Sequence, residues 1–147
     1  MDDAARLEVM IDHYTPEIAV AGRAALGTLR KLAPGAFEMV YDNWNGLVVG
    51  FGPNERPMQA VFSLLFVPRW LTLCFLFGKT LDDPHGLLKG DGNQVRSVRL
   101  IPPVTLDDPR VTDLIAQAIK ARGGWDFKRP STLSIKSVSA KQRPRRP

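Results

Sequence analysis

Apolar residues near the start of the chain recur with the period of an α-helix. Four of them stand at i, i+3, i+4 and i+7, namely Leu7, Met10, Ile11 and Tyr14. This spacing predicts a short amphipathic helix over residues 4–12, with Asp2 or Asp3 as its N-cap. A second helix start follows at Thr15–Glu17, where a capping residue precedes a proline and an acidic residue of the first turn.

This second helix carries one apolar face and ends at Pro34–Gly35. The face consists of Ile18, Ala21, Ala25, Leu29 and Leu32. Gly22 and Gly27 interrupt the helix, and each weakens it by about 1 kcal/mol relative to alanine. Close packing of the helix on a sheet would make these glycines tolerable.

After Gly35 the hydrophobic period changes from 3.6 to 2, which indicates β-strands. Residues 37–42 alternate in polarity, Asn45–Gly46 is a strong hairpin signal, and residues 47–51 form the returning strand.

Three further strands are expected. Residues 58–67 and 70–77 are almost continuously apolar, which is typical of central strands covered on part of both faces. Residues 95–101 form a fifth strand that ends at Pro102–Pro103.

The last predicted helix opens at Asp107–Asp108, with Pro109 near its first position, and ends at Gly123–Gly124. Its apolar stripe consists of Val111, Leu114, Ile115, Ala118 and Ile119. Helix, run of strands and helix define an α+β fold. We expect an antiparallel sheet of about five strands, with the N- and C-terminal helices packed on one face.

The basic character of the chain is concentrated at its C-terminal end. Seven Lys and Arg residues stand against the single Asp126 in residues 126–147, a net charge of +6. The whole chain carries +5, so residues 1–125 carry −1. We therefore expect one domain over residues 1–124 and a flexible basic tail over residues 125–147, with Trp125 and Phe127 holding the start of the tail. Nucleic acid could bind only through phosphate contacts of this tail.

Composition narrows the cellular setting. Cys74 is the only cysteine and lies in an apolar strand, so we expect an inert buried thiol and a reducing compartment. The start Met1–Asp3 lacks the pattern of a signal peptide, and the most apolar stretch is too short and too interrupted to span a membrane. These features predict a cytoplasmic protein with no membrane association.

The loop over residues 81–92 gathers the most chemistry-bearing side chains in the shortest stretch. They are Asp82, Asp83, His85 and Asp91. Asp and His are good ligands for iron, zinc or manganese, although the spacing matches no established ligand motif. The structural alternative is favoured: Asp82 or Asp83 caps a turn, Leu87 and Leu88 dock into the core, and glycines reverse the chain.

Two further charged features could bind ions. Glu38 and Asp42 lie four apart on one strand and share a face. Such a pair could do acid/base work or hold a cation, but the favoured interpretation is the solvent face of an edge strand. Arg96, beside the glycine-rich loop, could contact an anion; an ion pair with a loop aspartate is the favoured interpretation.

No catalytic constellation is recognisable. The fragment Phe77–Thr80 resembles the end of a phosphate-binding loop, but Leu73 stands where the motif needs a glycine. No Ser/His/Asp arrangement, nucleophile elbow, HExxH or CxxC occurs. We therefore do not expect an enzyme.

The glycine-rich loop and its flanks carry a family resemblance. Residues Gly78–Leu100 read GKTLDDPHGLLKGDGNQVRSVRL, which resembles the L-x-D-P-x-x-L-L-x-G-x-G and V-R-x-V-R-L signature of the YdhG-like bacterial domain of unknown function. The segment Leu29–Glu38 resembles its joint between helix and first strand. The resemblance spans roughly residues 14–122.

This resemblance implies a frataxin-like fold, with two helices on one face of an antiparallel sheet. Some relatives have been proposed as frataxin-like iron chaperones, and frataxins bind iron through an acidic ridge on the first helix and the adjoining edge strand. The first hypothesis is a non-enzymatic binding or adaptor domain for an unknown protein or small ligand, without a cofactor. The alternatives are an Fe(II) chaperone that uses Glu38, Asp42 and the Asp82–Asp91 loop, and weak nucleic-acid association through the tail.

Overall fold

The computed structural model describes residues 1–101 and 105–147, so the expected strand end at Pro102–Pro103 lies outside the described residues. The helices are α1 (Asp3–Asp12), α2 (Pro16–Leu32) and α3 (Pro109–Arg122). The strands are β1 (Phe37–Asp42), β2 (Leu47–Gly52), β3 (Phe62–Phe66), β4 (Leu71–Phe75), β5 (Arg96–Leu100) and β6 (Thr132–Val138). Two short 3₁₀ helices are η1 (Pro57–Gln59) and η2 (Gly78–Thr80).

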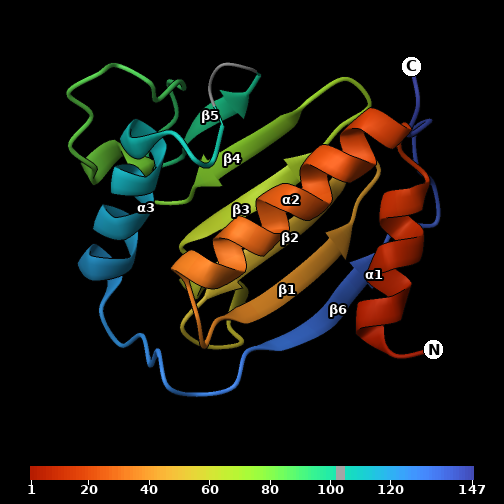
Figure 1. The fold of residues 1–147 in the computed structure, drawn as a ribbon, viewed down its shortest axis with the longest axis horizontal. Coiled ribbons are helices and arrows are strands. Elements are labelled where there is room, and N and C mark those ends of the chain that lie inside the picture. The colour runs from red at the N-terminus through yellow and green to blue at the C-terminus, as the bar shows by residue number, and fades with distance from the viewer. Residues whose placement is uncertain (102–104) are drawn as a thin grey trace.

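The described strands form one sheet in the order β5-β4-β3-β2-β1-β6 (Figure 1). Neighbours from β1 to β5 are antiparallel, whereas β6 runs parallel to β1. The α+β class is confirmed, but the expectation of five antiparallel strands is wrong, because the sheet has six strands and is mixed.

The sixth strand comes from the segment that we expected to be a flexible tail. Leu133 and Ile135 of β6 pack against the hydrophobic core, and Ile135 donates its backbone N–H to Asp3 of α1 at 3.0 Å. Only alternate positions of β6 face the core, so its apolar content is low. Because of this low apolar content and the surrounding charged residues, the composition of the segment does not indicate a strand. The expected anchor is present: Trp125 stacks on Phe62, with ring centroids 6.4 Å apart.

The helix starts lie where local sequence places them. Asp2 accepts a hydrogen bond from the backbone N–H of Ala5, Thr15 caps α2 with Pro16 in the first turn, and Asp108 caps α3. The strand bounds are shorter than expected, because Met58 lies in η1 and the stretch after Phe75 turns into η2.

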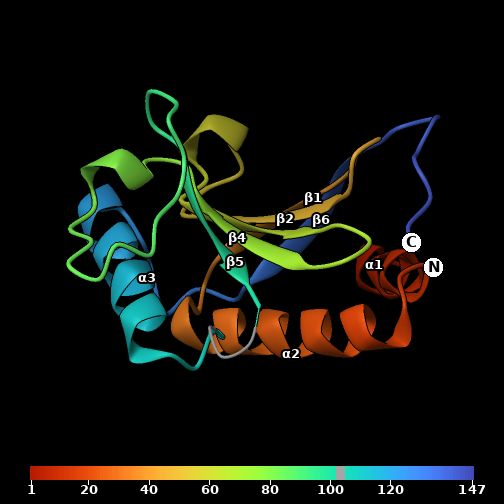
Figure 2. The same ribbon diagram turned by 90° about the horizontal axis from the view of Figure 1, so that it is seen from above.

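All three helices lie on one side of the sheet (Figure 2). α2 runs along that face, and α1 and α3 lie near its two ends. The core between the layers includes Leu26 and Leu29 of α2, Leu64 of β3 and Leu114 of α3, all buried. No helix in the described part of the chain is long and apolar enough to cross a membrane.

Candidate functional site

The two carboxylates of β1 are buried and paired with arginines. Glu38 is 5% exposed and accepts two hydrogen bonds from Nε of Arg30 and one from its Nη2, at 2.9 to 3.2 Å. Arg30 lies on α2, so Glu38 faces the helical layer. β1 is flanked by β2 and β6 and is not an edge strand. The expectation that these carboxylates form the solvent face of an edge strand is therefore wrong.

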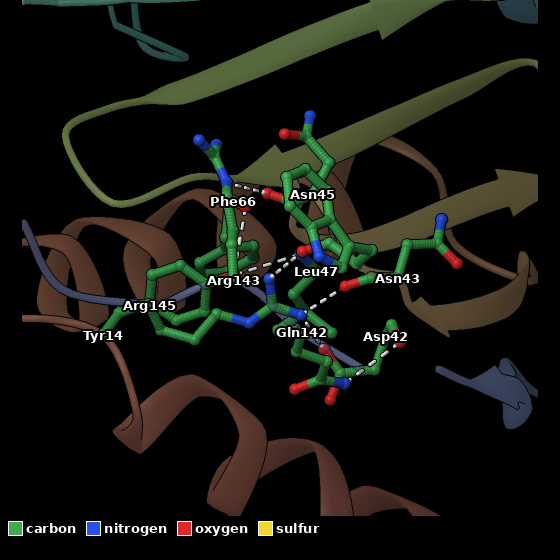
Figure 3. A network of polar contacts seen from close by, with 10 residues as sticks. Tyr14, Asp42, Asn43, Asn45, Leu47, Phe66, Gln142, Arg143 and Arg145 are labelled. Carbon is green, nitrogen blue, oxygen red and sulfur yellow. Dashed lines mark hydrogen bonds and ion pairs between the residues drawn. The ribbon is translucent and has the colours of Figure 1, made fainter. Parts of the chain in front are cut away.

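Asp42 pairs with the C-terminal segment. Its carboxylate accepts from Nη2 of Arg145 at 2.9 Å, and the side chains of the pair are 8% and 6% exposed. The same guanidinium also donates to the backbone carbonyl of Asn43 (Figure 3) and to that of Trp44. A buried cation is thus matched by one carboxylate and two carbonyl oxygens, which is how a charge becomes tolerable inside a protein.

The neighbouring arginines hold the C-terminal segment to backbone oxygens. Arg143 donates to the carbonyl of Asn45 at 2.7 Å, and Arg146 donates to that of His13 at 3.2 Å. Three arginines that we assigned to a free basic tail therefore bind the fold itself. Their role in nucleic-acid association remains an untested prediction.

Tyr14 joins this cluster to the core. Its hydroxyl donates to the carbonyl of Phe66 and accepts from the backbone N–H of Leu47, both at 3.1 Å (Figure 3). The Arg145 guanidinium carbon lies 5.9 Å from the centre of the Tyr14 ring. Desolvation by burial raises the pKa of the Tyr14 phenol above its ordinary value. The cluster is therefore a satisfied polar junction between α1, the β1–β2 hairpin and the C-terminus.

In the aspartate-rich loop, Asp83 has the structural role that we favoured. Its two carboxylate oxygens accept hydrogen bonds from the backbone N–H groups of Leu87 and Leu88, each at 2.9 Å. Both leucines are half-buried and pack against the core. The aspartate thus orders the turn that docks them.

The other predicted ligands of the loop do not converge. Asp82, His85 and Asp91 are exposed, and the backbone of Asp82 exchanges two hydrogen bonds with Gln117 of α3. The loop lies by β4, β5 and α3, with β2 and β3 between β4 and the two carboxylates of β1. Within residues 1–101 and 105–147, no three His, Cys, Asp or Glu side chains are placed to hold a metal ion.

Arg96 has a different partner from the one expected. Its Nη1 donates to the backbone carbonyls of Gly92 and Val95, both at 2.8 Å. A Cβ on Gly78 would lie 2.5 Å from Cβ of Arg96, so only glycine fits beside this strand. Among the described residues Arg96 forms no ion pair, and the predicted pair with a loop aspartate is wrong.

Sequence reasoning missed an apolar cavity between α3 and the ends of β3 and β4. Its volume is about 200 Å³. The walls consist of Val61, Phe75, Phe77, Thr80, Leu81, Ala118, Ala121 and Arg122. Half of these residues belong to α3 and η2, which lie side by side in both views of the ribbon (Figures 1 and 2).

Arg122 stands at the border of this cavity. Its guanidinium carbon lies 4.4 Å from the centre of the Phe77 ring, and its Nη2 donates to Oε1 of Gln59 at 2.7 Å. Arg122 and Phe77 also line a second, more open hollow with Met58 and Val95. One sequence signal existed: Arg122 follows Ala118 by four residues, so it continues the apolar stripe of α3 toward the sheet.

Cys74 is half-buried rather than fully buried, and it lies on the strand face turned away from the helices. Desolvation raises the pKa of its thiol, and a hydrogen bond with Ser63 partly offsets this effect. A thiol in this state is a poor nucleophile near neutral pH.

The chain matches no protein-family model, and comparisons with curated proteins and with solved structures find no similar protein.

Proposed function

We propose that this chain is a non-enzymatic binding domain that receives an apolar group in the cavity between α3 and β4. The proposal rests on the cavity itself, a space of about 200 Å³ whose lining includes Val61, Phe75, Leu81 and Ala118. The space is partly open to solvent and lies directly beside the core, so a ligand can reach apolar side chains there.

The volume sets the size of the group. An engineered apolar cavity of about 150 Å³ stays dry and binds benzene. A space of about 200 Å³ therefore suits an aromatic ring or a branched aliphatic group of similar size. Ligand sites are typically apolar hollows with a few polar groups that fix orientation. Thr80 and Arg122 are the polar members of this wall.

A titration with toluene, followed by ¹H–¹³C NMR of the methyl groups, tests the proposal. We expect saturable shifts confined to Val61 and Leu81 and their neighbours, with a Kd of about 1 mM or lower, as is reasonable for a seven-atom ligand. Ala121 is exposed and lines the cavity, so Ala121→Leu should fill the space and abolish the shifts. Ala116→Leu is the matched control, since Ala116 is exposed on the same helix but outside the cavity. Toluene shifts that persist in Ala121→Leu, or their absence in the unmodified protein, would refute the proposal.

Membership of the YdhG-like family, with its frataxin-like fold, is a further proposal. It is supported by the Gly78–Leu100 signature and by helices that cover one face of a mostly antiparallel sheet. The Fe(II) alternative gains no support from Glu38 and Asp42, because each carboxylate is already paired with an arginine.

A further inference from the structure

We infer that the ligand of this cavity carries a carboxylate next to its apolar group, and that Arg122 binds this carboxylate. The inference rests on the proposed apolar site and names its ligand class. It follows from three features of Arg122: its position at the border of two hollows, its orientation by Phe77 and Gln59, and its lack of an acidic partner.

The position of Arg122 is unusual for a basic residue whose only role is to interact with the dipole of its helix. A cation in the last turn of α3 favours the helix dipole, and Lys120 in the same turn does this from an exposed position. Arg122 instead is half-buried and lines the cavity. The dipole explains a basic residue in this turn but not one directed toward an apolar space.

Two neighbours fix the orientation of the guanidinium. Its central carbon lies over the Phe77 ring, 4.4 Å from the ring centre, and its Nη2 donates to Oε1 of Gln59 at 2.7 Å. A guanidinium has five N–H donors in a planar fork, so several remain for a ligand. Restraint before binding reduces the entropy lost when a ligand is bound.

Arg122 lacks a charged partner within the described residues. None of the six ion pairs there includes it. A guanidinium binds a carboxylate through two parallel N–H···O bonds, which are among the stronger hydrogen bonds in proteins. Charge complementarity therefore selects a carboxylate for this position.

The two hollows suggest how such a ligand lies. The apolar group fills the cavity between α3 and β4, which is partly open to solvent, and the carboxylate meets Arg122 at its border. Any larger remainder extends into the second hollow, which is more open and is lined by Met58, 84% exposed, and Val95, 50% exposed. This chemistry occurs in a free aromatic or branched acid and equally at the carboxyl terminus of a peptide.

Calorimetric and NMR titrations of the full chain with matched probes test the inference. Phenylacetate carries both groups, phenylacetamide removes only the charge, and toluene retains only the ring. We expect phenylacetate to bind at least about tenfold more tightly than phenylacetamide, because hydrogen bonds to charged groups are worth more than neutral ones. Arg122→Gln should abolish this preference without loss of toluene binding, and Lys120→Gln, the matched control, should leave it intact.

Two further probes identify the source of the acid. Acetyl-Ala-Ala-Phe with a free carboxylate and its amide extend the same chemistry toward the hollow at Met58. Tighter binding of the free tripeptide than of phenylacetate assigns the site to a peptide terminus, and equal or weaker binding assigns it to a free acid. The free tripeptide should also bind more tightly than its amide, and equal affinities of these two would count against the carboxylate.

The inference can fail while the apolar site stands. Toluene binding with equal affinities for phenylacetate and phenylacetamide would overturn it and leave the proposed function intact. A preference for phenylacetate that survives in Arg122→Gln would also overturn it. The probe comparison uses the unmodified protein, so it decides the question even if the variant does not fold.

Discussion

Asp42 and Arg145 stand 103 positions apart in the chain, yet they form a buried ion pair at 2.9 Å. This contact fixes the C-terminal segment to the β1–β2 hairpin and to the corner between α1 and α2. It also joins the first and last parts of the sequence, since Arg145 lies against the ring of Tyr14. The pair is therefore the clearest test of whether the C-terminal segment belongs to the fold.

Removal of Arg145 should strongly destabilise the protein, because it leaves the buried carboxylate of Asp42 unpaired. We expect Arg145→Met to lower the free energy of unfolding by about 3–5 kcal/mol in urea denaturation. The double variant Asp42→Leu/Arg145→Met should recover part of the loss, since no buried charge remains. Arg146→Met is the matched control: Arg146 is exposed, and its removal should change the free energy by less than about 1 kcal/mol. Equal effects of the two single variants would contradict the role of the pair.

Deletion of residues 125–147 should lower Tm by about 10 °C or more. The deletion removes β6, exposes the edge of β1 and leaves Asp42 without its partner. Thermal denaturation followed by circular dichroism measures the effect. A flexible tail would leave Tm unchanged, and that result would show that β6 contributes nothing to stability.

The helices and the first five strands could be predicted because their signals are local. The cap at Thr15, the alternation over residues 37–42 and the turn at Asn45–Gly46 each depend on neighbouring residues only. The sequence also predicts a turn ordered by Asp82 or Asp83, since short polar side chains commonly bond nearby backbone groups, and Asp83 is the one that does so.

What could not be predicted depends on partners distant in the sequence. The role of Asp42 depends on Arg145, and that of Glu38 depends on Arg30 of α2. β6 was missed because its few apolar residues stand in a segment rich in Ser, Lys, Arg and Pro, whose composition is typical of a flexible tail. The cavity was missed because an unfilled space results from how elements pack. One local feature of the sequence pointed to the cavity: Arg122 continues the apolar stripe of α3.

Cys74 should react slowly with iodoacetamide, because the reactive species is the thiolate and burial disfavours it. The pKa of this thiol is raised in the folded state. The midpoint of the alkylation rate against pH should therefore lie above the value of about 8.5 for a free cysteine. The same protein in concentrated guanidinium chloride is the control and should show the ordinary midpoint. A folded-state midpoint at or below that of the unfolded chain would contradict the prediction.

Anaerobic calorimetry with Fe(II) should show no binding at micromolar metal. A cation at β1 would have to displace Arg30 from Glu38 and Arg145 from Asp42. Binding in this range that is lost on changing Glu38 and Asp42 to Asn would instead support the iron-chaperone alternative. A variant with Asp82 and Asp91 changed to Asn shows whether any iron binds at the loop or at β1, because these two side chains are exposed and distant from β1.

The two glycines within α2 should respond to alanine with opposite signs. A Cβ on Gly22 would lie 2.0 Å from Cε2 of Phe66, a buried ring of β3, whereas a Cβ on Gly27 would meet no atom within 4 Å. Alanine favours a helix over glycine by about 1 kcal/mol, so Gly27→Ala should raise the free energy of unfolding by about that amount. In Gly22→Ala the overlap with Phe66 should outweigh this gain, with a net loss of about 1–2 kcal/mol. Urea denaturation of both variants measures the difference.

Phe66→Leu relieves the overlap, so Gly22→Ala should be less harmful in that background. A stabilising effect of Gly22→Ala in the unmodified chain would show that α2 can move away from the sheet.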